Sequence, residues 1–246
     1  KFVKIVYKQE ANSLYPVRQL QDWTAAAIKQ DYPSLYNEFV TKWIEKYDVV
    51  CNIPDNNPET YQQTIVVERH GTLSKNYNLY YKIEHMPEHG NWDKTRDYLE
   101  HLFGNKIDVA LDWLYLTWNR PTVKVPAIAL VSKEKNTGKS TFIFWLELLF
   151  QQNAIIISND DLNSNWNDDY AAKKIIAVDE GFIEKKIVAE KLKSWITNRK
   201  INLNAKFAGR TPIDWFATLV LCSNDEDNFV RIDDDEYRYF VNKVPV

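Results

Sequence analysis

Hydrophobic and polar positions follow a repeating order in the second half of the chain. Short apolar runs alternate with longer segments whose apolar residues recur at helical spacing. The runs expected to form buried strands are 127–131, 154–158, 175–178, 216–222 and 238–244. The helices expected between them include 141–152 and 190–198. This alternation predicts an α/β fold with a central parallel sheet that binds ligands at the carboxyl ends of its strands.

The first 92 residues have a mixed pattern. Residues 1–7 alternate between polar and apolar positions, as in a short strand. Segments 17–29 and 34–47 have apolar residues at helical spacing, and 63–85 indicates two strands around a turn. A smaller α+β or helical region is therefore expected here, and its residues do not indicate a role.

A helical pattern follows at 93–118, with a break at Gly104 and Asn105. After it comes a polar linker punctuated by proline, which is the most plausible domain boundary. The expected units are an N-terminal accessory region at 1–92, a helical collar or linker at 93–124, and a core at 125–246.

The composition of the chain and the spacing of its Cys and His residues indicate its cellular compartment and argue against a metal site built from these residues. The chain has 246 residues, a net charge of −3 and no apolar run long enough to cross a membrane. It begins without Met, so a fragment of a longer protein is expected, with no signal peptide. Cys51 and Cys222 have no companions at metal-ligand spacing, which favours buried thiols in a reducing cytoplasm. His85 and His89 have such spacing, but Pro87 argues against a helix there, so no metal is expected at these histidines.

A polar loop follows the run at 127–131 and closes on Gly-Lys-Ser-Thr at 138–141, where a helix opens. In such a loop the backbone N–H groups face a polyphosphate, Lys139 reaches the outer phosphates and the Ser140 hydroxyl binds Mg²⁺. Lys133 stands where the pattern has its first glycine, which costs little if its φ is negative. The alternative interpretation is an ordinary helix cap. The candidate nucleotide-binding residues are Asn136, Thr137, Gly138, Lys139, Ser140 and Thr141.

Two later strands end in polar side chains. The run 175–178 leads into Asp179 and Glu180. At this distance after the loop and its helix, Asp179 is predicted to hold Mg²⁺, and Glu180 to orient and deprotonate an attacking water. The run 216–222 leads to Asn224, whose amide could reach a γ-phosphate or that water. The alternatives are a helix cap for the acidic pair and a turn residue for Asn224.

Charge is segregated locally, although the net charge does not indicate nucleic-acid binding. Residues 185–210 contain eight basic residues and one acidic residue, whereas 225–236 contain seven acidic residues and one basic residue. A hairpin is expected at 201–214, with Lys206 and Arg210 around its tip. The lysines better explained as a solvated helix face are Lys185, Lys186 and Lys191.

The order of these features resembles the superfamily 3 helicases, and most closely the helicase domains of phage, plasmid and mobile-element primase-helicases. The resemblance covers about residues 95–246 and implies a P-loop NTPase of AAA+ type that uses ATP and Mg²⁺. The matching motif residues are Lys139 and Ser140 in motif A, Asp179 and Glu180 in motif B, Lys193 and Lys206 in motif B′, and Asn224 in motif C.

The resemblance also implies how the domain works. Members form a homo-hexamer or other ring that translocates on single-stranded DNA, here during replication of a phage or mobile element in the bacterial host cytoplasm. A primase domain or another replication protein is an expected partner, and a membrane is not. Arg238 would enter a neighbour's nucleotide site in trans, although one Arg of the family's Arg-Arg-aromatic stretch is missing here. The residues expected at the DNA are Lys193, Lys206 and Arg210.

Two other functions remain open on the residues alone. One is a P-loop NTPase that acts on RNA or protein, as in a packaging motor or a switch. The other is an interaction module that binds a nucleotide without hydrolysing it. The acidic and water-positioning candidates favour an enzyme over such a module.

Overall fold

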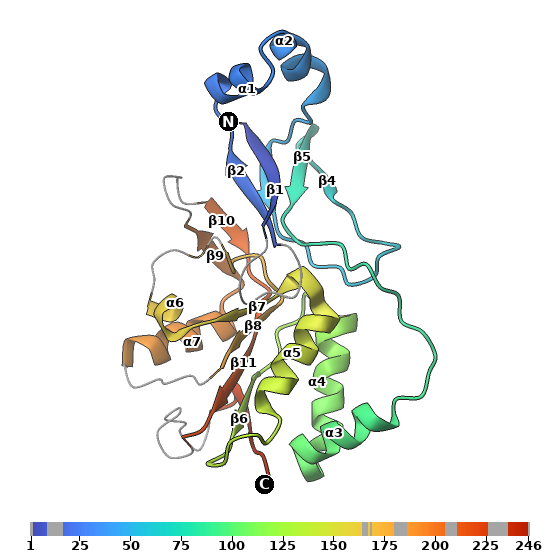
Figure 1. Cartoon of the computed structure of the whole chain (residues 1–246), viewed down its shortest axis with the longest axis vertical. Coiled ribbons are helices and arrows are strands. Elements are labelled where there is room, and N and C mark those ends of the chain that lie inside the picture. Colours follow the sequence, from blue (N-terminus) through green and yellow to red (C-terminus); the bar gives the residue numbers. More distant parts are fainter. Residues whose placement is uncertain are drawn as a thin grey trace.

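The computed structural model describes residues 2–8, 17–163, 167, 169–179, 186–204, 211–225 and 236–245. An α/β core lies in the lower part of Figure 1, and the N-terminal strands and helices lie at its upper end. Within these described ranges, no helix combines the length and apolar character needed to span a bilayer.

The core is organised around a five-stranded sheet in which every strand runs parallel to its neighbours. In order across the sheet, the strands are β12 (Tyr239–Lys243), β6 (Ala127–Val131), β11 (Thr218–Ser223), β8 (Ile175–Val178) and β7 (Ala154–Ile157). Both faces of this sheet are buried, which explains why the strands are apolar along their length. The predicted α/β class and parallel sheet are confirmed, with strand ends within two residues of those expected.

Helices cover both faces of the sheet (Figure 1). On one face lie α3 (Asp93–Phe103), α4 (Ile107–Asn119) and α5 (Lys139–Phe150), and on the other lie α6 (Asn159–Asn163) and α7 (Lys186–Thr197). Alternate side chains of β6 point to the two faces of the sheet. Ile128 and Leu130 pack against α3, α4 and α5, whereas Ala129 and Val131 pack on the side of α6 and α7. The break expected after α3 is a 3₁₀ turn, η2 (Gly104–Lys106).

The N-terminal region contains two small sheets and two short helices. Its strands are β1 (Val3–Lys8) paired with β2 (Val17–Asp22), and β3 (Val49–Cys51), β5 (Thr72–Asn78) and β4 (Thr64–Arg69) in that order. Its helices are α1 (Ala25–Asp31) and α2 (Tyr36–Glu38), followed by a π-helical turn, η1 (Phe39–Trp43). The two strands expected around a turn in 63–85 are confirmed as β4 and β5, joined at His70 and Gly71 in left-handed backbone conformations.

The helix expected at 17–29 is wrong in its first half. Residues 17–22 pair antiparallel with β1, and α1 begins only at Ala25, where the Thr24 hydroxyl accepts a hydrogen bond from Ala27 N. Cross-strand pairing supplied by β1 overrides the local helical spacing. The helix expected at 34–47 is likewise reduced to α2 and η1.

The N-terminal region docks at the amino edge of the core sheet, opposite the ends from which the loops at 132 and 179 leave. The side chain of Asn153, at the end of the short helix η3 (Gln151–Asn153), is fully buried. It donates to Tyr81 O and accepts from Tyr81 N, both at 2.9 Å. Asn52 Nδ2 donates to Asp214 O at 3.1 Å, which joins β3 to the core hairpin. The docking therefore leaves the carboxyl edge of the sheet free.

The expected hairpin at 201–214 is present as β9 (Lys200–Leu203) and β10 (Thr211–Asp214), which pair antiparallel. Its tip, with Lys206 and Arg210, lies outside the described residues.

A buried lysine, Lys174, and a half-buried lysine, Lys124, lie at the amino ends of the central strands. Lys174 Nζ donates to Phe216 O at 3.1 Å and to Thr218 Oγ1 at 2.9 Å, and nearby Lys124 Nζ donates to Ala217 O at 3.3 Å. Burial, with a smaller contribution from the Lys124 charge, lowers the pKa of Lys174 from 10.5 to about 7. Burial lowers the pKa of Lys124 to about 8.

Stability is expected to rise as the pH increases from about 7 towards 10.5. In this window the unfolded chain keeps the Lys174 proton and the folded chain releases it, so the unfolded state binds more protons. Urea unfolding near pH 6.5 and near pH 9 should give a larger free energy at the higher pH, and Lys174→Met should reduce that difference. Lys94→Met removes an exposed lysine and should not. An equal rise in Lys174→Met would contradict the assignment.

Candidate functional site

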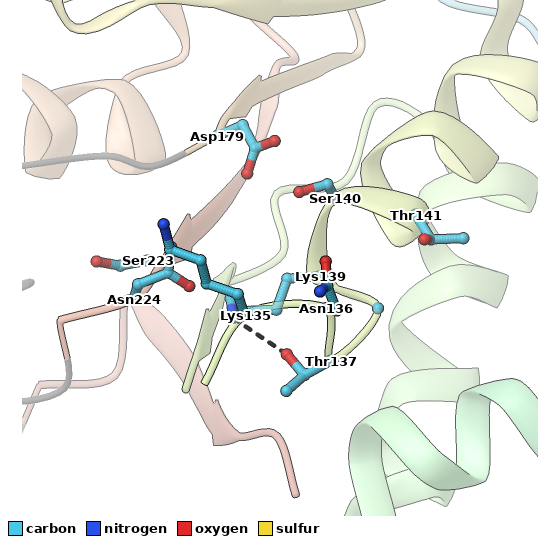
Figure 2. Close-up of a pocket in the computed structure, with 10 residues that line it drawn as sticks. Lys135, Asn136, Thr137, Lys139, Ser140, Thr141, Asp179, Ser223 and Asn224 are labelled. Atoms are coloured by element: carbon cyan, nitrogen blue, oxygen red, sulfur yellow. Dashed lines mark hydrogen bonds between the residues drawn. The ribbon is translucent and has the colours of Figure 1, made fainter. Parts of the chain in front are cut away.

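A cavity of about 360 Å³ opens at the carboxyl edge of the sheet, where β6, β11 and β8 end (Figure 2). This volume is typical of small-molecule sites, which range from about 300 to 1,000 Å³. Because β11 lies between β6 and β8, the groups that end β11 stand between the loop after β6 and Asp179 after β8. The residues that line the cavity are Lys135, Asn136, Thr137, Gly138, Lys139, Ser140, Thr141, Asp179, Ser223 and Asn224.

The loop between β6 and α5 turns through two left-handed residues, Asn136 with φ 60° and Gly138 with φ 95°. Asparagine tolerates this conformation better than most side chains. Gly138 is further constrained, since a Cβ there would lie 3.2 Å from Tyr98 Cε2. Lys133 has no positive φ, so a side chain at that position causes no backbone strain. A turn of this kind can point successive N–H groups into a concave site for an anion.

Lys139 begins α5, and its side chain folds back on the loop. Its Nζ donates to Glu134 O at 3.2 Å and to Thr137 Oγ1 at 3.1 Å, and the residue is buried. These are neutral acceptors, which hold the ammonium group at the cavity wall (Figure 2). An anionic oxygen in the cavity would be a stronger acceptor than either, so the ammonium group is placed for an exchange of partners.

Two residues of α3 hold the loop from outside, and the sequence did not indicate them. Tyr98 OH donates to Gly138 O at 2.8 Å, and His101 Nε2 lies 3.2 Å from Thr137 O. Burial raises the pKa of Tyr98, so its hydroxyl stays protonated as a donor. Their spacing of three residues places both on one face of α3. Nothing local to α3 reveals that this face meets a loop about forty residues later.

The oxygen donors of the cavity suit a magnesium ion that carries phosphate. The Asp179 carboxylate and the Ser140 hydroxyl are turned towards one another across the cavity (Figure 2). Magnesium sites commonly use one or two protein oxygens and complete their shell with water and substrate phosphates. Among the residues that the structure describes, no group of three or more His, Cys, Asp or Glu side chains forms a metal cage. The donor set thus fits Mg²⁺ bound together with a polyphosphate.

The other predicted site residues either lie away from the cavity or are not among the residues that the structure describes. Glu180, next to Asp179, is among the residues not described, so its role stays a prediction. Arg238 lies just before β12 and forms an ion pair with Glu236 at 2.6 Å. Lys193 of α7 is 3.7 Å from the same carboxylate. Neither cation is among the described residues that line the cavity.

Comparisons with known proteins found one family profile and several solved structures that resemble this chain. A profile described as a "Family of unknown function (DUF5906)" matches residues 130–238, less than half of the chain. Among curated proteins, none matches the sequence of this chain.

Three solved structures of one protein are similar in fold. The apo structure of NrS-1 C terminal region (305–718) has a TM-score of 0.69 at 20% identity and covers 92% of this chain and 54% of its own. Two A-form apo structures of that region give TM-scores of 0.67 and 0.68 at 20% and 18% identity. They cover 92% and 99% of this chain, and 54% and 59% of their own. The chain thus spans a little over half the length of these structures and shares their fold.

Removing the Tyr98 hydroxyl should loosen the loop without unfolding the protein. Tyr98→Phe removes one hydrogen bond to Gly138 O and leaves the bond from Phe142 N at 3.0 Å. One hydrogen bond contributes about 1 kcal/mol, so amides of the loop and first turn of α5 should exchange hydrogen about fivefold faster. Tyr115→Phe, at an exposed tyrosine on α4, serves as the control. Unchanged exchange in Tyr98→Phe would show that α3 does not restrain the loop.

Proposed function

We propose that this chain is an ATP-dependent DNA helicase or translocase domain that acts in replication of a phage or mobile element and hydrolyses ATP between subunits of a ring. The observation that carries the proposal is the convergence of a phosphate-binding type of loop, Asp179 and Asn224 on one cavity. In the sequence these residues lie up to about ninety positions apart. Their meeting at the carboxyl edge of a parallel sheet is the arrangement by which P-loop NTPases bind and hydrolyse a nucleotide.

In the proposed reaction, water attacks the γ-phosphate of ATP in line with the leaving group. Lys139 and the amino end of α5 stabilise the negative charge of the phosphates. Ser140 and Asp179 would hold Mg²⁺, which would supply positive charge to stabilise the transferred phosphate. The Asn224 amide positions the water, and Glu180 takes its proton.

Arg238 fits a role in a neighbouring subunit rather than in its own. Arg238 O accepts a hydrogen bond from Ala127 N, so it is level with the first residue of β6, whereas the loop follows the last residue. At about 3.3 Å per residue, the five residues of β6 separate the two by roughly 15 Å. A guanidinium group at the amino edge can complete a site only in a second copy. Arginine supplied in trans is a known means of stabilising transferred phosphate charge.

The hairpin β9–β10 is the proposed DNA-tracking element. Both strands are anchored at their base, where Trp215 N donates to Arg199 O and Asp214 O accepts from Asn52. Lys206 and Arg210 of the intervening segment supply the positive charge. Single-stranded DNA is the proposed partner because a basic groove element that follows the phosphate backbone needs no particular base sequence.

Lys139→Ala should abolish ATP hydrolysis, with a fall in kcat of at least about a hundredfold, because the lysine contacts the charge that develops in the transition state. The measurement is phosphate release with single-stranded DNA present. Lys94→Ala, at an exposed lysine of α3, should keep wild-type turnover. Survival of DNA-stimulated turnover in Lys139→Ala would refute the site assignment.

Binding to single-stranded DNA should weaken steeply with salt. Each neutralised phosphate adds about 0.7 to the slope of log affinity against log salt, so Arg210→Ala should reduce the slope by about that amount. Lys191→Met is a matched control, because it removes one charge from the same basic segment. Lys191 Nζ donates a hydrogen bond to Leu162 O at 2.6 Å. Equal affinity for single-stranded DNA, RNA and duplex would count against a replication role.

A further inference from the structure

The loop between β6 and α5 contains a second lysine that has no part in the proposed reaction. Lys135 lines the cavity together with Lys139, and it is exposed, whereas Lys139 is buried. Lys133, two residues earlier in the same loop, is not among the described residues that line the cavity. Lys135 therefore adds a positive charge inside the candidate site itself.

The two lysines approach the cavity from different sides. The loop reverses its direction between them through the two left-handed residues described above. Lys139 Nζ is held beside Thr137, to whose Oγ1 it donates at 3.1 Å. In Figure 2 the Lys135 side chain instead extends from the loop towards the end of β11, where Ser223 and Asn224 lie. An anion bound between the lysines would meet a positive charge on each side.

Hydrogen bonds fix the base of the loop beside β11. Ser132 N donates to Ser223 O at 3.2 Å, and Ser132 Oγ accepts from Glu134 N at 3.2 Å. On the other strand, Ser223 Oγ accepts from Asp225 N at 3.1 Å. Lys135 follows Ser132 by three residues, so at most about 11 Å of chain separates its backbone from this anchored point. The Lys135 side chain thus starts from a fixed base close to the end of β11.

The Lys135 charge is not neutralised within the part of the chain that the structure describes. No described carboxylate forms an ion pair with Lys135. The Asp179 carboxylate lines the same cavity, but it is the proposed ligand of Mg²⁺. An anionic phosphate oxygen would give the Lys135 ammonium group a charged acceptor, and such hydrogen bonds are about twice as strong as neutral ones.

The direction of the Lys135 side chain indicates which phosphate it would meet. Asn224 is proposed to position the water that attacks the γ-phosphate, and Lys135 extends towards the strand end that carries Asn224 (Figure 2). The outermost phosphate would therefore lie nearest to Lys135. A nucleoside diphosphate lacks this group and would leave the Lys135 ammonium group without its acceptor.

We propose that Lys135 binds the γ-phosphate from the side of Asn224, so that the site distinguishes a nucleoside triphosphate from a diphosphate. The inference rests on the proposed function, because it assigns a further contact at the same nucleotide site. Lys139 contacts the phosphates from the side of the loop and α5, and Lys135 contacts the last of them from the opposite side. Lys135 is thus a residue that determines the specificity of this site.

The test is isothermal titration calorimetry of the whole chain in the presence of Mg²⁺. The two probes are ADP and the non-hydrolysable ATP analogue with an imido bridge between its β- and γ-phosphates. The wild type should bind both. Lys135→Met should weaken binding of the analogue about tenfold and leave ADP affinity within about twofold, because only a charge-assisted hydrogen bond to the third phosphate is lost. Lys135→Arg keeps the charge and should retain most of the preference for the triphosphate.

A matched control is Lys243→Met. Lys243 is an exposed lysine of β12 that pairs with Val131, the last residue of β6, and it is not among the described residues that line the cavity. This variant therefore removes the same charge from the same edge of the sheet without changing the site. Its affinities for both probes should equal those of the wild type.

The outcomes separate the inference from the proposed function. Equal weakening of ADP and the analogue in Lys135→Met would overturn the inference, because the residue would then shape the loop or bind an inner phosphate. Unchanged affinity for both probes would overturn it as well and leave nucleotide binding standing. A wild type that binds neither probe would refute the proposed function, and the inference with it.

Discussion

Hydrogen bonding between β6, β11 and β8 sets the position of every group at the candidate site. Their parallel register pairs Ser223 with Val131 and Leu221 with Val178, so β6 and β11 end at the same level and β8 ends two residues short of it. The loop after β6, the Asp179 carboxylate and the Asn224 amide therefore leave the sheet together. A slip of one residue would turn a strand's side chains to the opposite face and place apolar groups at this edge.

The N-terminal region packs against the opposite, amino edge of the core sheet. Its buried contact through Asn153 and its bond to Asp214 lie at the amino edge, so the cavity stays open. The second contact joins β3 to the base of the β9–β10 hairpin.

In the proposed function, a second copy completes the site because Arg238 lies about one strand length away from the loop of its own chain. The Glu236 carboxylate holds the turn before β12 in place by accepting hydrogen bonds from Arg238 N and Nη1.

The sequence by itself determined the parts whose signals are local. Mostly apolar runs identified four of the five core strands, and the strand-like run at 238–244 identified the fifth. The glycine and hydroxyl residues at 138–141 identified the opening of α5, because burial and helix starts depend on neighbouring residues. Only the tertiary structure decided that residues 17–22 join β1 as a strand, since the partner strand supplies the hydrogen bonds that override helical spacing. It also decided that Tyr98 and His101 restrain the loop, and that Arg238 lies at the opposite edge from its own cavity. Contacts between distant segments follow from strand order and packing, which no local pattern of residues encodes.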